Sequence, residues 1–200
     1  MRNGPRLSKF AAVFIAVIKV VSLTAAGQSP SPANASAKAS ESMLPREVVV
    51  PISTVNRFFP EVTQQASTGL NLTAVANAQA TRSVVYANSD GSKKVTITVD
   101  KYSTVGDASS AYQEAVTKSK TVPGFKPLSA ENLGQNAFVG TVTQGGETHI
   151  GLGALHGTLI LGVTLAGYDP TPENTAKLIS LTREEERAAK AASLNAIPKK

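Results

Sequence analysis

The 200-residue chain has no cysteine and no tryptophan, and it contains only two histidines. The absence of cysteine excludes disulfide bonds, thiolate metal sites, cysteine nucleophiles and the acylated cysteine of a bacterial lipoprotein. Neither the G-x-S-x-G nor the H-E-x-x-H catalytic motif occurs in the sequence. The sequence therefore offers no catalytic motif, and it leads us to expect no cofactor and no bound metal ion.

The chain also lacks any acidic residue before Glu41 and any uninterrupted apolar run of the about 20 residues that span a membrane. Its first residues are basic, Phe10 to Ile18 are apolar, and small residues follow at positions 25–27. This layout is typical of a secretory signal peptide, which we predict at residues 1–27. We expect a secreted or periplasmic protein without a stable membrane span after cleavage. An uncleaved membrane anchor and an organellar transit peptide are the alternatives.

The positive net charge of the sequence comes largely from this N-terminal segment. The formal net charge is +6, and Arg2, Arg6, Lys9 and Lys19 all precede the expected cleavage point. The remaining chain is close to neutral and has no basic stripe with interleaved aromatic residues. We therefore expect no nucleic-acid partner.

Composition divides the rest of the chain into three parts. Residues 28–47 begin with a stretch rich in Ser, Ala and Pro, which predicts a disordered linker. Residues 48–182 hold the periodic apolar patterns of a folded domain. Residues 183–200 are charged and rich in Ala, which predicts a helical or disordered C-terminal tail with Glu184 to Glu186 on a solvated helix face.

Strand signals dominate the central part of the domain. Residues 136–168 alternate with period two around turns at Gly145-Gly146 and His156-Gly157, which predicts a three-strand meander. Asp90-Gly91 predicts the turn of a hairpin between residues 83–88 and 93–102. Residues 63–81 are weakly patterned and read mostly as loop, with an irregular strand or a short helix as the alternatives around residues 70–75; such a strand would be the sixth of the sheet.

Helix signals flank these strands. Helical spacing of apolar residues predicts helices at 52–62 and 106–120, and Thr171-Pro172-Glu173 is a strong helix start. The expected fold is α+β, in the order α-ββ-α-βββ-α. It contains one antiparallel sheet of five to six strands, with helices packed on one face.

The strands carry an unusual number of threonines and glycines. Gly151 to Gly157 is rich in glycine, but it leads from strand to strand and not into a helix, which excludes a nucleotide-binding loop. A shallow sheet surface of this kind can hold a small apolar ligand or a peptide. The ligand-binding residues that we predict are Thr96, Thr98, Thr141, His149, Gly151 and Gly153.

Leu133-Gly134, Ala137-Phe138, the following hairpin and the run from Gly157 to Val163 resemble small secreted α+β domains of the bacterial cell envelope. The extracellular sensor domains of mycobacterial serine/threonine kinases are one such group. Those domains usually carry disulfides, which this cysteine-free chain lacks. The resemblance implies an exported sensing domain and assigns no functional residue.

Three functions are consistent with these patterns. The first is an exported, non-enzymatic binding or sensing module of the cell envelope, with an unknown small apolar ligand or an envelope protein as its partner. The second is an exported hydrolase that uses His149 or His156 as its base. The third is a structural envelope protein whose C-terminal helix binds a partner.

Overall fold

A computed structural model describes residues 43–71, 77–128, 136–144 and 146–195. The expected signal peptide and most of the expected linker lie outside the described residues, as does Gly145 of the first meander turn. The described elements, in chain order, are η1 (Arg46–Val48), α3 (Ile52–Phe58), β1 (Gln64–Asn71), β2 (Ala80–Ala87), β3 (Lys94–Lys101), α4 (Val105–Lys120), β4 (Lys126–Pro127), β5 (Ala137–Gln144), β6 (Glu147–His156), β7 (Leu159–Ala166) and α5 (Pro172–Asn195).

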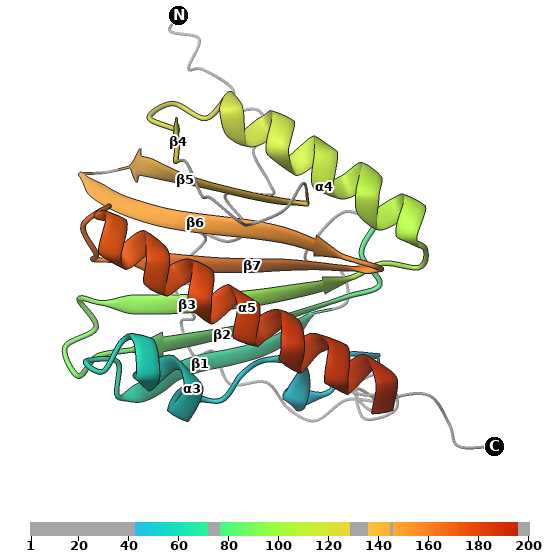
Figure 1. Ribbon diagram of the computed structural model, residues 1–200, viewed down its shortest axis with the longest axis horizontal. Coiled ribbons are helices and arrows are strands. Elements are labelled where there is room, and N and C mark those ends of the chain that lie inside the picture. The colour runs from blue at the N-terminus through green and yellow to red at the C-terminus, as the bar shows by residue number, and fades with distance from the viewer. Residues whose placement is uncertain (1–42, 72–76, 129–135, 145, 196–200) are drawn as a thin grey trace, which may run out of the picture.

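The strands form one antiparallel sheet in the order β1-β2-β3-β7-β6-β5-β4 (Figure 1). The predicted α+β class, the β2–β3 hairpin and the β5–β6–β7 meander are confirmed. The sheet has seven strands and not five to six, because β1 and the short β4 add one strand at each edge. β1 runs over residues 64–71 and so begins well before the strand expected around residues 70–75.

Local sequence signals explain where several elements begin and turn. Gly91 and Gly157 adopt positive φ angles of 72° and 58° in the two hairpin turns, a conformation that glycine adopts without steric penalty. The Thr104 side chain caps α4 by accepting a hydrogen bond from the Asp107 amide. Thr171 caps α5 in the same way through the Asn174 amide.

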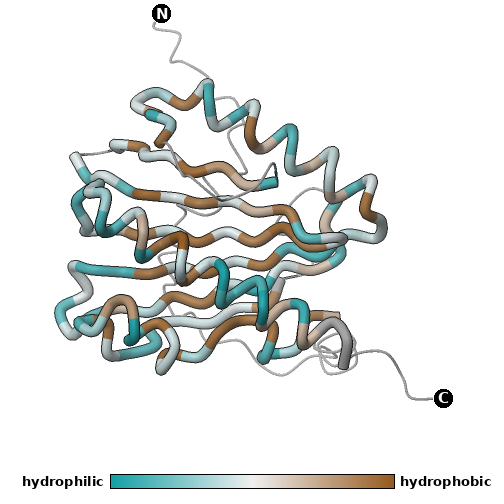
Figure 2. Tube along the Cα trace, viewed as in Figure 1, coloured by the Kyte–Doolittle hydropathy of each residue, from teal (hydrophilic) through white to brown (hydrophobic). Residues whose placement is uncertain are grey.

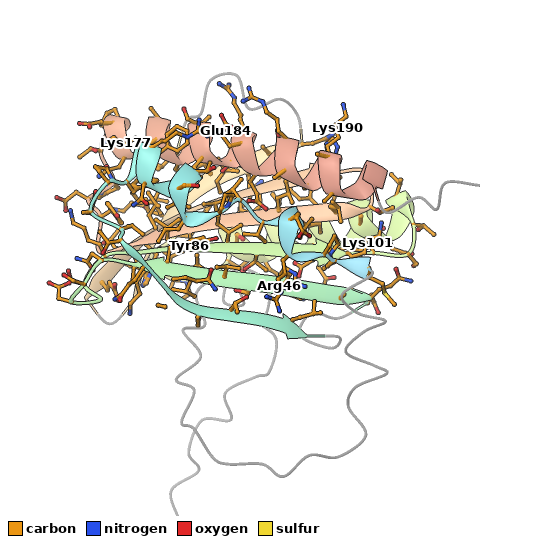
Figure 3. All side chains as sticks on the ribbon, turned by 90° about the horizontal axis from the view of Figure 1, so that it is seen from below. Arg46, Tyr86, Lys101, Lys177, Glu184 and Lys190 are labelled. Atoms are coloured by element: carbon orange, nitrogen blue, oxygen red, sulfur yellow. The ribbon has the colours of Figure 1, made fainter. Side chains whose placement is uncertain are left out.

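The main hydrophobic core lies between one face of the sheet and α5, with α3 and η1 beside it (Figure 3). On the strands this core uses alternate residues, such as Leu161 and Val163 of β7, and α5 contributes Leu178 and Leu181. Figure 2 shows apolar residues concentrated on the central strands, whereas hydrophilic residues recur along α5. Among the described residues, no helix is long and apolar enough to cross a membrane.

α4 packs on the opposite face of the sheet, so the expectation that the helices cover one face is wrong. Ala108 and Tyr112 of α4 contact Ile160, which alternates along β7 with the core residues Leu159 and Leu161. The topology explains this position. β3 and β5 are separated in the sheet by β7 and β6, and α4 makes the crossing between them on the face that α5 leaves free.

The packed domain extends beyond the expected limits at both ends. Leu44 is buried in the main core, and its carbonyl accepts hydrogen bonds from the Arg82 guanidinium at 2.8 and 2.6 Å. At the other end, α5 continues past Thr182, and Glu185 and Ala189 are fully buried. The expectation of a solvated helix face at Glu184 to Glu186 is therefore wrong for Glu185.

Glu185 helps to attach the N-terminal segment to α5. Its Oε2 atom accepts a hydrogen bond of 2.9 Å from the Val50 amide, and the Val50 carbonyl accepts one of 2.6 Å from the Tyr86 hydroxyl. The Oε1 atom of Glu185 is buried without a hydrogen-bond partner. Burial raises the pKa of the Glu185 carboxyl from its ordinary 4.5 to about 8, although the hydrogen bond from the Val50 amide acts in the opposite direction.

This carboxyl makes the stability of the fold depend on pH. Between about pH 4.5 and pH 8 the folded chain retains a proton on Glu185 that the unfolded chain releases. The free energy of unfolding therefore falls as the pH rises through this window, by at most about 1.4 kcal/mol per pH unit. Glu185→Gln should flatten this dependence and make the protein more stable than the wild type at pH 8, as measured by urea unfolding across the window.

Glu186→Gln on the same helix is the matched control, because Glu186 is only partly buried. Its pH profile should follow that of the wild type. Profiles of wild type and Glu185→Gln that run parallel from pH 5 to pH 9 would contradict the buried, protonated state of Glu185.

Candidate functional site

The register of the sheet brings most of the predicted ligand-binding residues onto the face that carries α4. Thr96 lies opposite Thr164, which lies opposite Gly151 on the next strand. In the adjacent row, Thr98 lies opposite Gly162, which lies opposite Gly153. We call this surface the threonine–glycine face and define it by Thr81, Ser83, Thr96, Thr98, Asp100, Gly151, Gly153, Gly162 and Thr164.

Thr141 does not belong to this face, so the expectation that it shares one sheet surface with the other predicted site residues is wrong. It lies opposite Ile150 on β6, and Ile150 is a residue of the main core. Neighbouring residues of a strand point to opposite faces, so the pairing of β5 with β6 decides the face of Thr141. The alternation within β5 alone does not fix that pairing.

Four polar residues of the face were not predicted as site residues from the sequence, namely Thr81, Ser83, Asp100 and Thr164. Thr81 and Ser83 of β2 lie opposite Asp100 and Thr98 of β3, and Thr164 lies on β7. A signal for the β2 residues was available, because a hairpin around Asp90-Gly91 with this register places residue 81 opposite residue 100. Thr164 had no comparable signal, since β7 and β3 are far apart in the chain.

Asp100 is the buried carboxyl of the face. It is 7% exposed, and its Oδ1 atom accepts a hydrogen bond of 2.6 Å from the Thr81 hydroxyl. Burial raises the pKa of Asp100 to about 6, although the hydrogen bond from Thr81 acts in the opposite direction. The next row contains a longer contact of 3.4 Å from the Thr98 hydroxyl to that of Ser83. Asp100 therefore supplies a hydrogen-bond acceptor at the end of β3, on the same side of that strand as the hydroxyl groups of Thr96 and Thr98.

Thr164 is the residue of this face that most needs an explanation. Its side chain is 4% exposed, and its Oγ1 atom is buried without a hydrogen-bond partner. An unpaired buried hydroxyl is unfavourable, because folding removes the water that solvates it and supplies no replacement. A hydrogen-bonding group of a ligand would satisfy this hydroxyl.

Aromatic rings under α4 form one border of the face. The Phe138 ring lies over Gly153, where a Cβ atom would come within 2.6 Å of it. The Tyr112 ring of α4 packs against Phe138 with 5.8 Å between the ring centroids. The Phe125 ring, from the connection after α4, occupies the space above Gly140. The missing side chains of Gly140 and Gly153 thus make room for aromatic rings at this border.

The two histidines lie apart from each other and from the centre of the face. His149 is buried on the same side of the sheet opposite Ala166, with Nε2 3.6 Å from Oε2 of Glu147. His156 is exposed at the turn between β6 and β7. Within the described residues, no group of three or more His, Asp or Glu side chains is arranged to hold a metal ion.

Comparisons with known proteins show similarity in fold but not in sequence. No protein-family model matches the chain, and no curated protein sequence matches it. Among solved structures, the extracellular domain of the kinase PknH from Mycobacterium tuberculosis is similar, with a TM-score of 0.55 and 11% sequence identity. The similarity covers 70% of this chain and 93% of that domain. The expected resemblance to extracellular sensor domains of mycobacterial kinases is therefore confirmed at the level of the fold.

A second solved structure is LpqN, described as involved in cell envelope biogenesis of Mycobacterium tuberculosis. It has 16% sequence identity and covers 60% of this chain and 82% of its own. Its TM-score of 0.33 is too low to support an argument from similarity.

The unpaired hydroxyl of Thr164 yields a stability test of the site. Thr164→Val keeps the shape of the side chain and removes the hydroxyl, so it should raise the free energy of unfolding of the ligand-free protein by roughly 1 kcal/mol. Thr182→Val is the matched control, because the buried Thr182 hydroxyl donates to the Leu178 carbonyl at 2.9 Å and its loss should bring no gain. Urea unfolding measures both. A Thr164→Val variant less stable than the wild type would show that the hydroxyl is already paired.

Proposed function

We propose that this chain is an exported, non-enzymatic binding or sensing module of the cell envelope that holds a small ligand on the threonine–glycine face. The observation that carries the proposal is the buried, unpaired Thr164 hydroxyl in the middle of that face. A natural sequence retains an unfavourable polar group of this kind most readily where it has a function.

Two further observations support the same proposal. The fold is similar to that of a domain that lies outside the cell, the extracellular domain of PknH. The two sides of the sheet also differ in chemistry: one buries aliphatic residues under α5, whereas the other carries hydroxyl groups and glycines beside the smaller apolar cluster under α4. Such a division leaves one face for the core and the other for recognition.

The two alternative functions gain no specific support from the described residues. A hydrolase would require a histidine that reaches a nucleophile or its orienting carboxylate, and His149 is 3.6 Å from the Glu147 carboxylate, just beyond hydrogen-bond distance. A partner-binding C-terminal helix would require a free apolar side. α5 instead places Leu178, Leu181 and Ala189 in the core, while Lys177 and Lys190 lie on its outer side (Figure 3).

The proposal is tested by expressing the full chain in an export-competent bacterium and isolating it from the envelope fraction for native mass spectrometry. The wild-type protein should carry a non-covalently bound small molecule, and Thr96→Leu should lose it by placing bulk beside Thr164. Thr148→Leu is the matched control. It alters another half-buried strand threonine, one on the opposite side of the sheet, and should retain the bound mass.

Two results would contradict the proposal. One is a wild-type chain without any bound mass, and the other is a bound mass that Thr96→Leu and Thr148→Leu retain equally. The mass of the same chain also reports whether the N-terminal residues were removed during export.

A further inference from the structure

We propose that the chain forms a homodimer in which the edge strand β1 of one copy pairs antiparallel with β1 of a second copy. The two seven-stranded sheets then become one continuous sheet. This inference goes beyond the proposed function and does not depend on it, because it concerns the outer edge of the sheet and not the threonine–glycine face.

β1 presents an open line of backbone hydrogen-bonding groups. Within the part of the chain that the structure describes, β1 pairs with β2 alone and forms one edge of the sheet (Figure 1). Every second residue of an antiparallel edge strand directs its N–H and C=O groups away from its single neighbour. The irregularity in the β1–β2 pairing lies between Gln65 and Ser67, so residues 67–71 keep a regular register. This segment is a template on which another strand can add.

The two edges of the sheet differ in their protection against such pairing. Monomeric proteins protect sheet edges with short strands, with charged side chains, especially lysine, and with proline. β4 at the opposite edge has all three features, because it consists only of Lys126 and Pro127. β1 is eight residues long and contains neither a charged residue nor a proline. The chain thus protects one edge of its sheet and leaves the other able to pair.

The side chains of β1 leave room for a neighbouring strand. Residues 64–69 are all exposed, and Leu70 is half-buried. A Cβ atom placed on Gly69, in the middle of the regular segment, would meet no described atom within 4 Å. A strand of a second copy, at the usual spacing of about 4.8 Å, can therefore approach β1 without displacing a described element.

Charge and closure favour a second copy as the partner. Because β1 carries no charge, pairing it with itself brings no like charges together, and a charged peptide would gain no ion pair from it. Pairing of two copies uses both β1 edges and leaves only the protected β4 edges outside. The assembly therefore closes as a two-fold dimer and does not continue into a fibre.

The dimer also fixes the relative orientation of the two threonine–glycine faces. Residues directly opposite each other in an antiparallel pair point to the same side of the sheet. The two-fold axis is then normal to the sheet, and both threonine–glycine faces lie on one side of the joined sheet.

The test is sedimentation equilibrium of the full chain, isolated from the envelope fraction, over a concentration series from micromolar to millimolar. The wild type should approach twice the mass of one chain. Thr68→Lys should weaken dimerisation by at least about tenfold, because it places like charges of the two copies on adjoining strands. Thr117→Lys is the matched control. It adds the same charge at an exposed position of α4 and should dimerise like the wild type.

Amide hydrogen exchange of the wild type tests the same pairing without a substitution, and it decides the matter if Thr68→Lys fails to fold. Alternate amides of residues 67–71 should exchange more slowly at the highest concentration than at the lowest, whereas amides of the central strand β7 should not change. A chain that stays monomeric throughout, or a dimer that Thr68→Lys leaves intact, would overturn the inference. Protection of these amides that is the same at every concentration would also overturn it, because another occupant would then cover the edge.

Discussion

Eight consecutive residue pairs join β3 to β7, and this ladder turns two separate parts of the chain into one sheet. On one side of it lies the β1–β2–β3 part, and on the other lies the β5–β6–β7 meander with β4 at its edge. Because side chains alternate along each strand, the register of this ladder decides which residues share a face. A shift of one residue would place Thr164 among the aliphatic residues of the main core and Leu165 on the opposite face.

The two faces that follow from this register have different roles. One face buries Ile97, Leu161 and Val163 beneath α5. The helix α5 is in turn joined to the N-terminal segment by the hydrogen bond between Glu185 and the Val50 amide. The other face has α4 at one border and polar rows at its centre. The stability of the domain thus resides mainly on one side of the sheet, and the other side is free to carry groups, such as the Thr164 hydroxyl, that contribute nothing favourable in the absence of a ligand.

Those parts of the fold that depend on local signals could be predicted from the sequence. The β2–β3 hairpin follows from Asp90-Gly91, the turn between β6 and β7 from Gly157, and the start of α5 from Thr171 and Pro172. The start and extent of β1 were missed because its residues are mostly polar and lie at the sheet edge, where a strand needs no apolar alternation to form.

The remaining features depend on contacts between distant parts of the chain. The face occupied by α4 follows from the insertion of β7 between β3 and β6, which no local pattern reveals. The same insertion brings Thr164 beside Thr96. The burial of Glu185 follows from the packing of α5 against the segment around Val50, although its charged neighbours in the sequence are typical of a solvated helix. Five of the predicted site residues nonetheless lie on one face, because each belongs to a strand whose alternation is clear; they are Thr96, Thr98, His149, Gly151 and Gly153.

The most direct measurement of the β3–β7 register uses the absence of native cysteine. Residues directly opposite each other in an antiparallel pair have Cβ atoms about 4.5–5.5 Å apart, close enough for a disulfide after small adjustments. Under mild oxidation, Thr96→Cys combined with Thr164→Cys should form an intramolecular disulfide rapidly, and Thr96→Cys combined with Val163→Cys should remain reduced. Efficient cross-linking of the Val163→Cys pair, with none for the Thr164→Cys pair, would show that the threonines and glycines do not share a face.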